Sequence, residues 1–234
     1  MLTLAIDTVS TQGSLALIRD REIIASQTWA KASSHSETIT AAFHELLSKN
    51  NLSSNQLTRL AVNVGPGSFT GIRVGVTFAR TLSYSYQLPI FALNGLHLLA
   101  SQPAVKSHSI LRVAQYAFRN LIYTAEYSLD HGLVKETQSP RAVTITALEL
   151  LIDRDILVVG TGYNSLLSHC SHDLRAKMIR DPSARDYSEA IDFLYTSAID
   201  KSPPGLTDWI HTIPLYIRAS EAEEKLNSGI IKSH

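Results

Sequence analysis

Cysteine is nearly absent from this chain, since Cys170 is the single one among 234 residues. An intrachain disulfide is therefore excluded, and such a composition is typical of a reducing compartment. The sequence also lacks any apolar run near the roughly 18 residues that a membrane helix requires. The residues after Met1 lack the basic start of a signal peptide. We expect a cytoplasmic protein that does not contact a membrane.

An excess of positive charge is missing as well, because 21 Lys and Arg residues balance 21 Asp and Glu residues. A protein that binds nucleic acid unaided usually carries a basic surplus or stripe, since neutralising phosphates supplies much of the affinity. No Lys/Arg cluster of that kind is present. If the chain serves a nucleic-acid pathway, we expect a partner to hold the nucleic acid.

Histidines are present, but none of the nine has another histidine four residues away, the spacing that places two metal ligands on one helix face. His169 and His172 flank Cys170, yet a zinc site would need further ligands from elsewhere. We interpret that segment as a polar surface loop. His35 is followed by Ser-Glu, and we interpret this cluster as a helix start rich in capping residues rather than as an acid–base site.

The most informative segment is glycine-rich and covers residues 65–75, GPGSFTGIRVG. It follows a β-branched run at 60–64 and precedes a helical pattern at 74–86. We therefore predict a sharp strand-to-helix turn that Ser68 or Thr70 caps. A Walker loop would need a lysine after the last glycine, and a dinucleotide fingerprint would be one residue shorter. A nucleophile elbow would need a glycine where this loop has its proline. None of the three motifs fits.

Small residues recur every four positions along the helix that leaves this loop, which places them on one helix face. A flat face of this kind lets another element approach closely. Packing inside the chain is the usual role of such a stripe, and contact with a helix of a second chain is the functional alternative. The stripe consists of Gly71, Gly75, Ala79 and Ser83.

Strand and helix patterns divide the chain into two units, and its length allows one large or two small cores. The first unit opens with three strands joined by short polar turns, which predicts an antiparallel meander. Its expected strands are 2–6, 14–19, 22–29, 60–64 and 89–93, and its expected helices are 39–47, 74–86 and 95–100. The second unit has expected strands at 110–114, 121–129, 133–137 and 156–159 and expected helices at 146–152 and 188–199. We predict lobes at 1–102 and 103–205, and a tail at 206–234 that packs back on the first lobe.

Several segments together resemble one protein family over essentially the whole chain. They are similar to the bacterial TsaB (YeaZ) subunit of the tRNA threonylcarbamoyladenosine machinery, within the actin/sugar-kinase/Hsp70-like superfamily (ASKHA, RNase H-like). The resemblance implies an α/β fold of two actin-like lobes, each a mixed sheet flanked by helices. The segments are Ala5-Ile6-Asp7-Thr8, the glycine loop, Leu88-Pro89, and Pro214-Leu215-Tyr216-Ile217-Arg218 with Glu221-Ala222-Glu223.

This resemblance implies a pseudoenzyme subunit that forms a heterodimer with TsaD. TsaD-type proteins transfer the threonylcarbamoyl group to adenosine 37 of tRNAs that read codons starting with A. An ATPase, TsaE, joins the complex, and TsaC makes the threonylcarbamoyl-adenylate. The resemblance further implies a homodimer in isolation, tRNA contact only through the complex, and no cofactor beyond ATP or ADP at the heterodimer interface. The implied interface residues are Thr70, Gly71, Val74, Gly75, Phe78, Ala79 and Leu82.

Asp7 and Thr8 are the candidate cofactor-binding residues, because active members of the superfamily place an N-terminal aspartate beside metal and phosphates. Ser10 and Gly13 would complete a phosphate hairpin, with the Gly-Thr-Gly segment at 160–162 near an adenosine. The alternative is that Asp7 ends a strand and caps a turn. The rival function is accordingly a nucleotide hydrolase or small-molecule kinase. A metallopeptidase is a third possibility, for which the sequence lacks ligands.

The segment from Tyr116 to Tyr123 departs from the pattern of the family. Many members have Asp-Ala-Arg followed by Glu-Val-Tyr in this place, whereas this chain has YAFRNLIY. A tyrosine in place of the carboxylate offers no metal or base ligand. We therefore expect no catalytic role for this segment.

Overall fold

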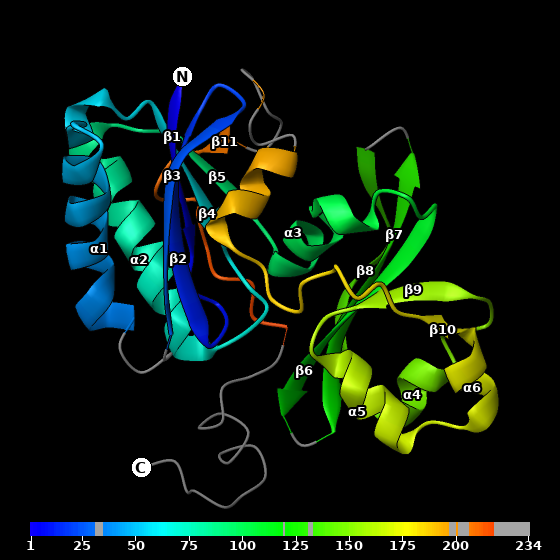
Figure 1. Cartoon of the computed structure of the whole chain (residues 1–234). Helices are drawn as coiled ribbons and strands as arrows, with labels where there is room; N and C mark the ends of the chain where they lie inside the picture. The colour runs from blue at the N-terminus through cyan, green and yellow to red at the C-terminus, as the bar shows by residue number, and fades with distance from the viewer. Residues whose placement is uncertain (31–34, 119, 131–132, 197–199, 201–205, 218–234) are drawn as a thin grey trace, which may run out of the picture.

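The computed structural model describes residues 1–30, 35–118, 120–130, 133–196, 200 and 206–217. Two sheets form two lobes that lie next to each other (Figure 1). The strand order is β11-β5-β4-β1-β2-β3 in the first sheet and β10-β9-β6-β7-β8 in the second. Both sheets are mixed and carry helices on their faces, which confirms the predicted α/β class with two actin-like lobes.

The first sheet is built around β1 (Leu2–Asp7). With β2 (Gln12–Arg19) and β3 (Glu22–Ala30), β1 forms an antiparallel meander, which confirms that prediction. On its other side, β1 runs parallel to β4 (Arg59–Asn63), which is parallel to β5 (Ile90–Leu93). The two-residue strand β11, Leu206–Thr207, pairs with the outer edge of β5.

Alternate residues of β1 belong to two different cores, as the period of a strand requires. Leu4 and Ile6 pack on the face that α1 (His35–Lys49) and α2 (Phe69–Tyr86) cover. Ala5 packs on the opposite face, together with residues of α3 (Gly95–Ser101) and of the 3₁₀ turn η4 (Ala190–Tyr195). Figure 1 shows α1 and α2 on one side of this sheet and α3 and η4 on the other. Because both faces are covered, all of β1 is buried.

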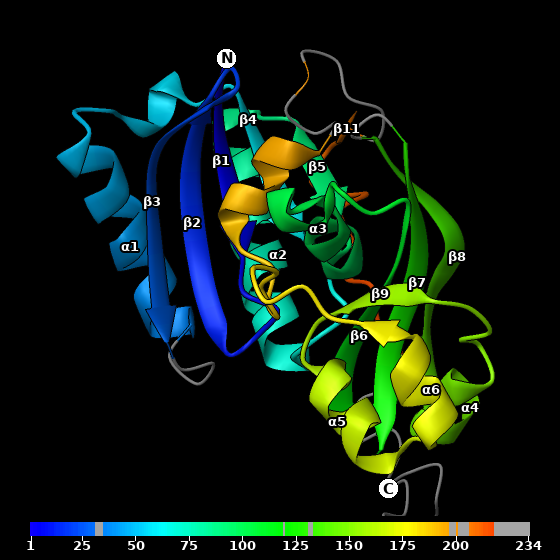
Figure 2. The same cartoon turned by 45° about the vertical axis from the view of Figure 1, so that its right-hand side comes forward.

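The second sheet has the same arrangement around its first strand. Helix α3 packs on one face through Leu96, Leu99 and Ala100, so this one helix contributes to the cores of both lobes. Three short helices cover the other face, which Figure 2 brings forward. The strands are β6 (Ile110–Phe118), β7 (Leu121–Asp130), β8 (Leu133–Thr144), β9 (Ile156–Val159) and β10 (Met178–Ile179). The helices are α4 (Ile145–Glu149), α5 (Gly162–His169) and α6 (His172–Lys177); the short 3₁₀ turns are η2 (Ser54–Gln56) and η3 (Pro103–Val105).

Helix α2 begins at Phe69, five residues before the predicted start. Of the two candidate caps, Ser68 is the N-cap, because its Oγ accepts a hydrogen bond from the Gly71 amide at 3.2 Å. The glycines at the start of the helix favour a loop by propensity alone. The cap and the tight packing of this turn override that preference.

The predicted helix at 188–199 is wrong in type and length. The chain forms the 3₁₀ turn η4 over Ala190–Tyr195, while residues 197–199 lie outside the described residues. Asp192 fixes this turn, because its carboxylate accepts the Glu189 amide at 2.9 Å and pairs with Arg185. Phe193 then packs into the core of the first sheet. The chain thus returns to the first lobe before β11, while the domain limits at 102 and 205 stay predictions.

The second lobe differs in detail from the predicted elements. Strand β8 extends to Thr144 and tolerates Pro140 because it lies at the sheet edge. Thr144 is the N-cap of α4, since its Oγ1 accepts a hydrogen bond from the Ala147 amide at 3.1 Å, and the helix covers Ile145–Glu149 rather than the predicted 146–152. Within the described ranges, no helix has the length and hydropathy to cross a bilayer.

Candidate functional site

Asp7 ends β1 in the interior of the protein and is fully buried. Its Oδ2 accepts hydrogen bonds from Asn63 Nδ2 at 2.8 Å and from Ser188 Oγ at 2.6 Å, and its Oδ1 accepts the Val9 amide at 3.1 Å. Burial raises the pKa of this carboxyl to about 6, although the three hydrogen bonds act in the opposite direction. Asp7 therefore ties β1, β4 and the segment before η4 together, which is the capping role proposed as the alternative.

Thr8 is also buried and directed inward. Its hydroxyl donates to the Gly71 carbonyl at 2.7 Å. Neither Thr8 nor Asp7 is among the residues that line the cleft between the lobes. The structure thus engages both candidate cofactor-binding side chains in internal hydrogen bonds, and a cofactor at this place stays a prediction.

The glycines of the loop and of α2 allow the backbone after β1 to approach the helix closely. A Cβ on Gly71 would lie 2.0 Å from the Thr8 carbonyl oxygen, and a Cβ on Gly67 would lie 2.3 Å from the Val9 carbonyl oxygen. At Gly75 the added atom would lie 2.4 Å from Thr8 Oγ1. No side chain fits at these distances, so the three glycines are needed inside this chain.

The small-residue face of α2 therefore packs against its own sheet, which is the usual role of such a stripe, whereas the implied interface with a second chain stays a prediction. Four of the seven predicted residues are buried within the chain: Gly71, Gly75, Ala79 and Leu82. Thr70 is exposed, and Val74 and Phe78 are half-buried. Only these three remain for a partner on the outward side of the helix.

The predicted phosphate hairpin after β1 is closed by its own contacts. The Ser10 hydroxyl donates to the Gln12 carbonyl at 2.9 Å and accepts the Gln12 amide at 3.1 Å. The indole of Trp29 covers Gly13, where a Cβ would lie 2.3 Å from the ring. His35 is the first residue of α1 and is buried; its ring accepts a hydrogen bond from the Trp29 indole N–H at 2.9 Å and contacts the Ser10 carbonyl at 3.1 Å.

The carboxyl end of β6 carries a second polar cluster, made from neutral groups. Thr161 Oγ1 donates to Gln115 Oε1 at 2.6 Å and accepts the Tyr116 amide at 3.0 Å. Gln115 Nε2 donates to the Asp186 carbonyl at 2.7 Å. The glycines beside Thr161 lie against the β6 backbone, where a Cβ on either would be 2.5 or 2.8 Å from the carbonyl oxygen of residue 114. The segment 160–162 thus packs on β6.

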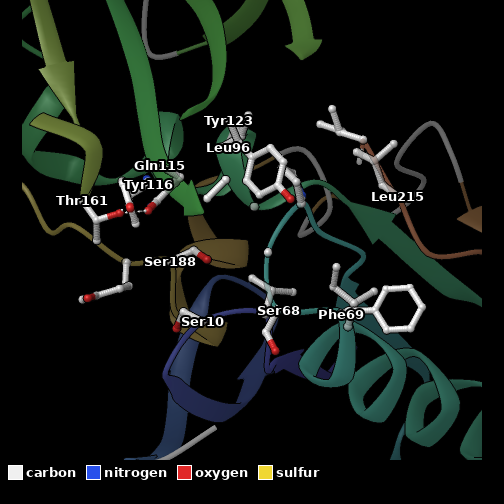
Figure 3. A pocket seen from close by; sticks show the side chains of 18 of the residues that line it. Ser10, Ser68, Phe69, Leu96, Gln115, Tyr116, Tyr123, Thr161, Ser188 and Leu215 are labelled. Carbon is white, nitrogen blue, oxygen red and sulfur yellow. Dashed lines mark hydrogen bonds between the residues drawn. The ribbon is translucent and has the colours of Figure 1, made fainter. Parts of the chain in front are cut away.

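A cleft of about 570 Å³ lies between the two polar clusters. Figure 3 shows Ser10 and Ser68 on the side of the first lobe, Gln115 and Thr161 on the side of the second, and Ser188 between them. The tail closes one end, where the Leu215 amide donates to the Val64 carbonyl at 2.8 Å. Tyr216 stacks on Phe69 with ring centroids 4.7 Å apart.

Two residues of the Asp7 cluster were missed by the sequence reasoning. Asn63 ends the strand parallel to β1, so the alignment of neighbouring parallel strands was a usable signal. Ser188 is 181 residues away from Asp7 and gave no such signal. In the described part of the chain, no three His, Cys, Asp or Glu side chains are grouped closely enough to hold a metal ion.

Comparison with known proteins gives one consistent result. Residues 22–151 match the family model of TsaD, tRNA N6-adenosine threonylcarbamoyltransferase. The tRNA threonylcarbamoyladenosine biosynthesis protein TsaB of Bacillus subtilis is 30% identical, covering 96% of this chain and 97% of that protein. TsaB of Escherichia coli is 28% identical, with 97% and 98% covered.

A solved structure agrees with this result at the level of the fold. YeaZ from Pseudomonas aeruginosa superposes with a TM-score of 0.75 at 20% identity, covering 92% of this chain and all of that one. The resemblance found in the sequence motifs is thereby confirmed. The chain belongs to the TsaB family of tRNA threonylcarbamoyladenosine biosynthesis proteins.

Proposed function

We propose that this chain is a non-catalytic subunit that binds a TsaD protein and supports threonylcarbamoylation of adenosine 37 in tRNAs that read codons starting with A. The observation that carries the proposal is the likeness to TsaB over 96% of the chain. The internal hydrogen bonds of Asp7 support it, because the carboxylate that an active superfamily member would direct at metal and phosphate is engaged here. The TsaD family match over 22–151 supports a common fold for the two partners.

We place the partner contact on the outward side of α2. Thr70, Val74 and Phe78 follow one another at four-residue spacing and so form a row on one side of the helix. Phe78 already touches Phe43 of α1 through an edge-on ring contact at 5.5 Å, so the row is continuous with α1. A helix pair of this kind presents a rigid surface to a second pair. The homodimer expected in isolation would use this same surface.

The test is co-elution of the chain with TsaD of the same organism in size-exclusion chromatography. Thr70→Arg and Val74→Arg place a long charged side chain on the proposed contact and should each weaken the heterodimer at least tenfold. Ser168→Arg is the matched control, because Ser168 is an exposed serine of α5 in the other lobe. Co-elution that both α2 variants leave unchanged would remove this helix from the interface.

A second experiment separates the proposal from the rival hydrolase or kinase. The purified chain alone, supplied with Mg²⁺ and ATP, should release no phosphate above background, whereas the complex with TsaD, TsaE and threonylcarbamoyl-adenylate should modify tRNA. Turnover by the chain alone that Asp7→Ala abolishes would establish the rival. ATP or ADP at the heterodimer interface stays a prediction, which equilibrium dialysis of the complex can check.

A further inference from the structure

We infer that the cleft between the lobes is a binding site for a small, flat, uncharged aromatic molecule. The cleft volume of about 570 Å³ lies within the range of roughly 300–1,000 Å³ that is usual for small-molecule sites. It is built at the carboxyl ends of strands from both lobes, where α/β proteins commonly bind ligands. The inference concerns the isolated chain and does not depend on the proposed partner.

Six aromatic side chains are among the residues that line the cleft, and they come from five separate segments. They belong to the start of α2, to β6, to β7, to the segment before η4 and to the C-terminal tail. Flat rings of this kind bind other flat rings by stacking or edge contacts. The aromatic residues that line the cleft are Phe69, Tyr116, Phe118, Tyr123, Tyr187 and Tyr216.

One aromatic wall is fixed in place before any ligand binds. Phe69 and Tyr216 stack at an interplanar angle of 28°, and the Arg73 guanidinium lies 4.0 Å from the centroid of the Phe69 ring. Arg73 Nε also donates to the Tyr216 hydroxyl at 3.2 Å. Three side chains therefore hold one another, which reduces the entropy that a ligand must offset on binding. Tyr216 is still 42% exposed.

The wall opposite includes two further aromatic residues, which belong to β6. Tyr116 and Phe118 line the cleft and remain 46% and 43% exposed. Thr161 accepts the Tyr116 amide and so fixes the position of this segment. Exposed aromatic rings therefore lie on both walls of the cleft.

The charge of the ligand follows from the lining. Among the described residues that line the cleft, none is Lys, Arg, His, Asp or Glu. A phosphate group needs cations or free backbone amides. The amides of Gly65, Ser68 and Gly71 in the glycine loop already donate to Asn63 Oδ1, the Val9 carbonyl and Ser68 Oγ. Because no side chain of the described lining supplies a cation, the site favours an uncharged ring over the same ring that carries phosphates.

Adenosine and Mg²⁺-free ATP are matched probes, because they share one aromatic base and differ in charge. Titration calorimetry of the full chain should give a dissociation constant for adenosine of roughly 0.1–1 mM, as expected for a ligand of this size in a partly open site. ATP should bind at least tenfold more weakly, and ribose should not bind. Equal or tighter binding of ATP, or no binding of adenosine up to millimolar concentration, overturns the inference.

Variants of one tyrosine locate the site. Tyr216→Ala removes a ring from the cleft and should weaken adenosine binding roughly tenfold, whereas Tyr216→Phe keeps the ring and should retain it. Tyr84→Ala is the control, because Tyr84 is an exposed tyrosine of α2 that does not line the cleft. Far-ultraviolet circular dichroism checks that each variant is folded. Wild-type affinity in Tyr216→Ala, or an equal loss in Tyr84→Ala, contradicts binding in this cleft.

Discussion

The last residue of β1 is a buried carboxylate, Asp7, whereas near the carboxyl end of β6 the corresponding polar side chain is a neutral amide, Gln115. Both ends are tied to the segment that returns to the first lobe, through Ser188 in one case and the Asp186 carbonyl in the other. None of the hydrogen-bond partners described for Asp7 is a cation, so burial favours its protonated form. An amide has no comparable dependence on pH. In both lobes a polar side chain binds the segment before η4, but the side chain is an ionisable carboxyl in the first lobe and a neutral amide in the second.

In both lobes glycines lie against a backbone carbonyl oxygen, just after β1 in the first lobe and within β6 in the second, and the contact is tighter in the first. A Cβ on Gly71 would lie 2.0 Å from the Thr8 carbonyl oxygen, whereas a Cβ on Gly162 would lie 2.8 Å from the Ala114 carbonyl oxygen. Backbone atoms cannot rotate away as side chains do. We therefore expect the first lobe to tolerate less change at this junction.

The largest effect is expected for Gly71→Ala, which must separate α2 from the end of β1. A loss of more than about 4 kcal/mol in the free energy of unfolding, or failure to fold, is the expected result. Gly162→Ala should lose about 1–2 kcal/mol, since a smaller shift relieves its contact. Urea unfolding followed by circular dichroism measures both. Equal losses in the two variants would remove the difference between the lobes.

A second difference concerns how charge is buried. In the second lobe Arg112 on β6 and Glu126 on β7 are opposite one another in register, with Nη2 and Oε2 2.5 Å apart, and both are buried. Removing one member of a buried pair leaves an uncompensated charge, so Glu126→Ala should cost about 3 kcal/mol. The double variant Arg112→Met/Glu126→Leu should recover most of that loss. Unfolding curves that show no recovery would mean that the pair itself stabilises the lobe.

The first lobe, by contrast, should show its buried carboxylate in the pH dependence of stability. Burial raises the pKa of Asp7 from 3.8 to about 6 and that of Asp192 to about 7. As the pH rises, the unfolded chain releases these protons first. The stabilisation is therefore fully present below about pH 4 and is lost as the pH rises through 6 to 7. For Asp7 alone the loss is on the order of 3 kcal/mol.

Asp7→Asn provides the check on this pH dependence. The variant cannot ionise at this position, so the lower part of the decline should flatten in urea unfolding measured across this pH range. Gln115→Glu is the reciprocal variant and places a carboxyl at the end of β6. It should add a pH dependence to the second lobe. If the free energy of unfolding of Asp7→Asn fell with pH as steeply as that of the wild type, groups other than Asp7 would cause the decline.

Much of the fold was predictable from local pattern, because hydrophobic alternation and turn residues act over short distances. The meander and the parallel strands β4 and β5 follow from such patterns, and α1 was found from Ile39, Phe43, Leu46 and Leu47, which are all buried. Helix propensity failed at the start of α2. There Gly71 and Gly75 pack against Thr8, which lies 63 or more residues away in the sequence, so helix propensity alone does not predict them.

The candidate site was harder to predict than the fold, because its contacts join distant segments. Asp7 was identified as a residue of interest, but whether it faces a ligand or the interior depends on Asn63 and Ser188. The alignment of parallel strands points to Asn63, but no local pattern points to Ser188. The cleft likewise gathers aromatic residues from five segments, each of which looks like an ordinary core or surface residue on its own.

The smallest effect on the free energy of unfolding is expected at Gln115, the neutral side chain near the end of β6. Gln115→Ala removes the acceptor of the Thr161 hydroxyl and the donor to the Asp186 carbonyl, and the partly exposed site lets water replace both. The loss in the free energy of unfolding should be about 1 kcal/mol and independent of pH.

Thr161→Val should give a similar loss, and the double variant should lose less than the sum of the two single losses, because the two side chains share one hydrogen bond. The Tyr116 amide donates a hydrogen bond to Thr161 Oγ1, so its hydrogen-exchange rate measures the local stability at this place directly. If Gln115→Ala lost as much free energy of unfolding as Gly71→Ala, the two junctions would be equally important to the stability of the fold.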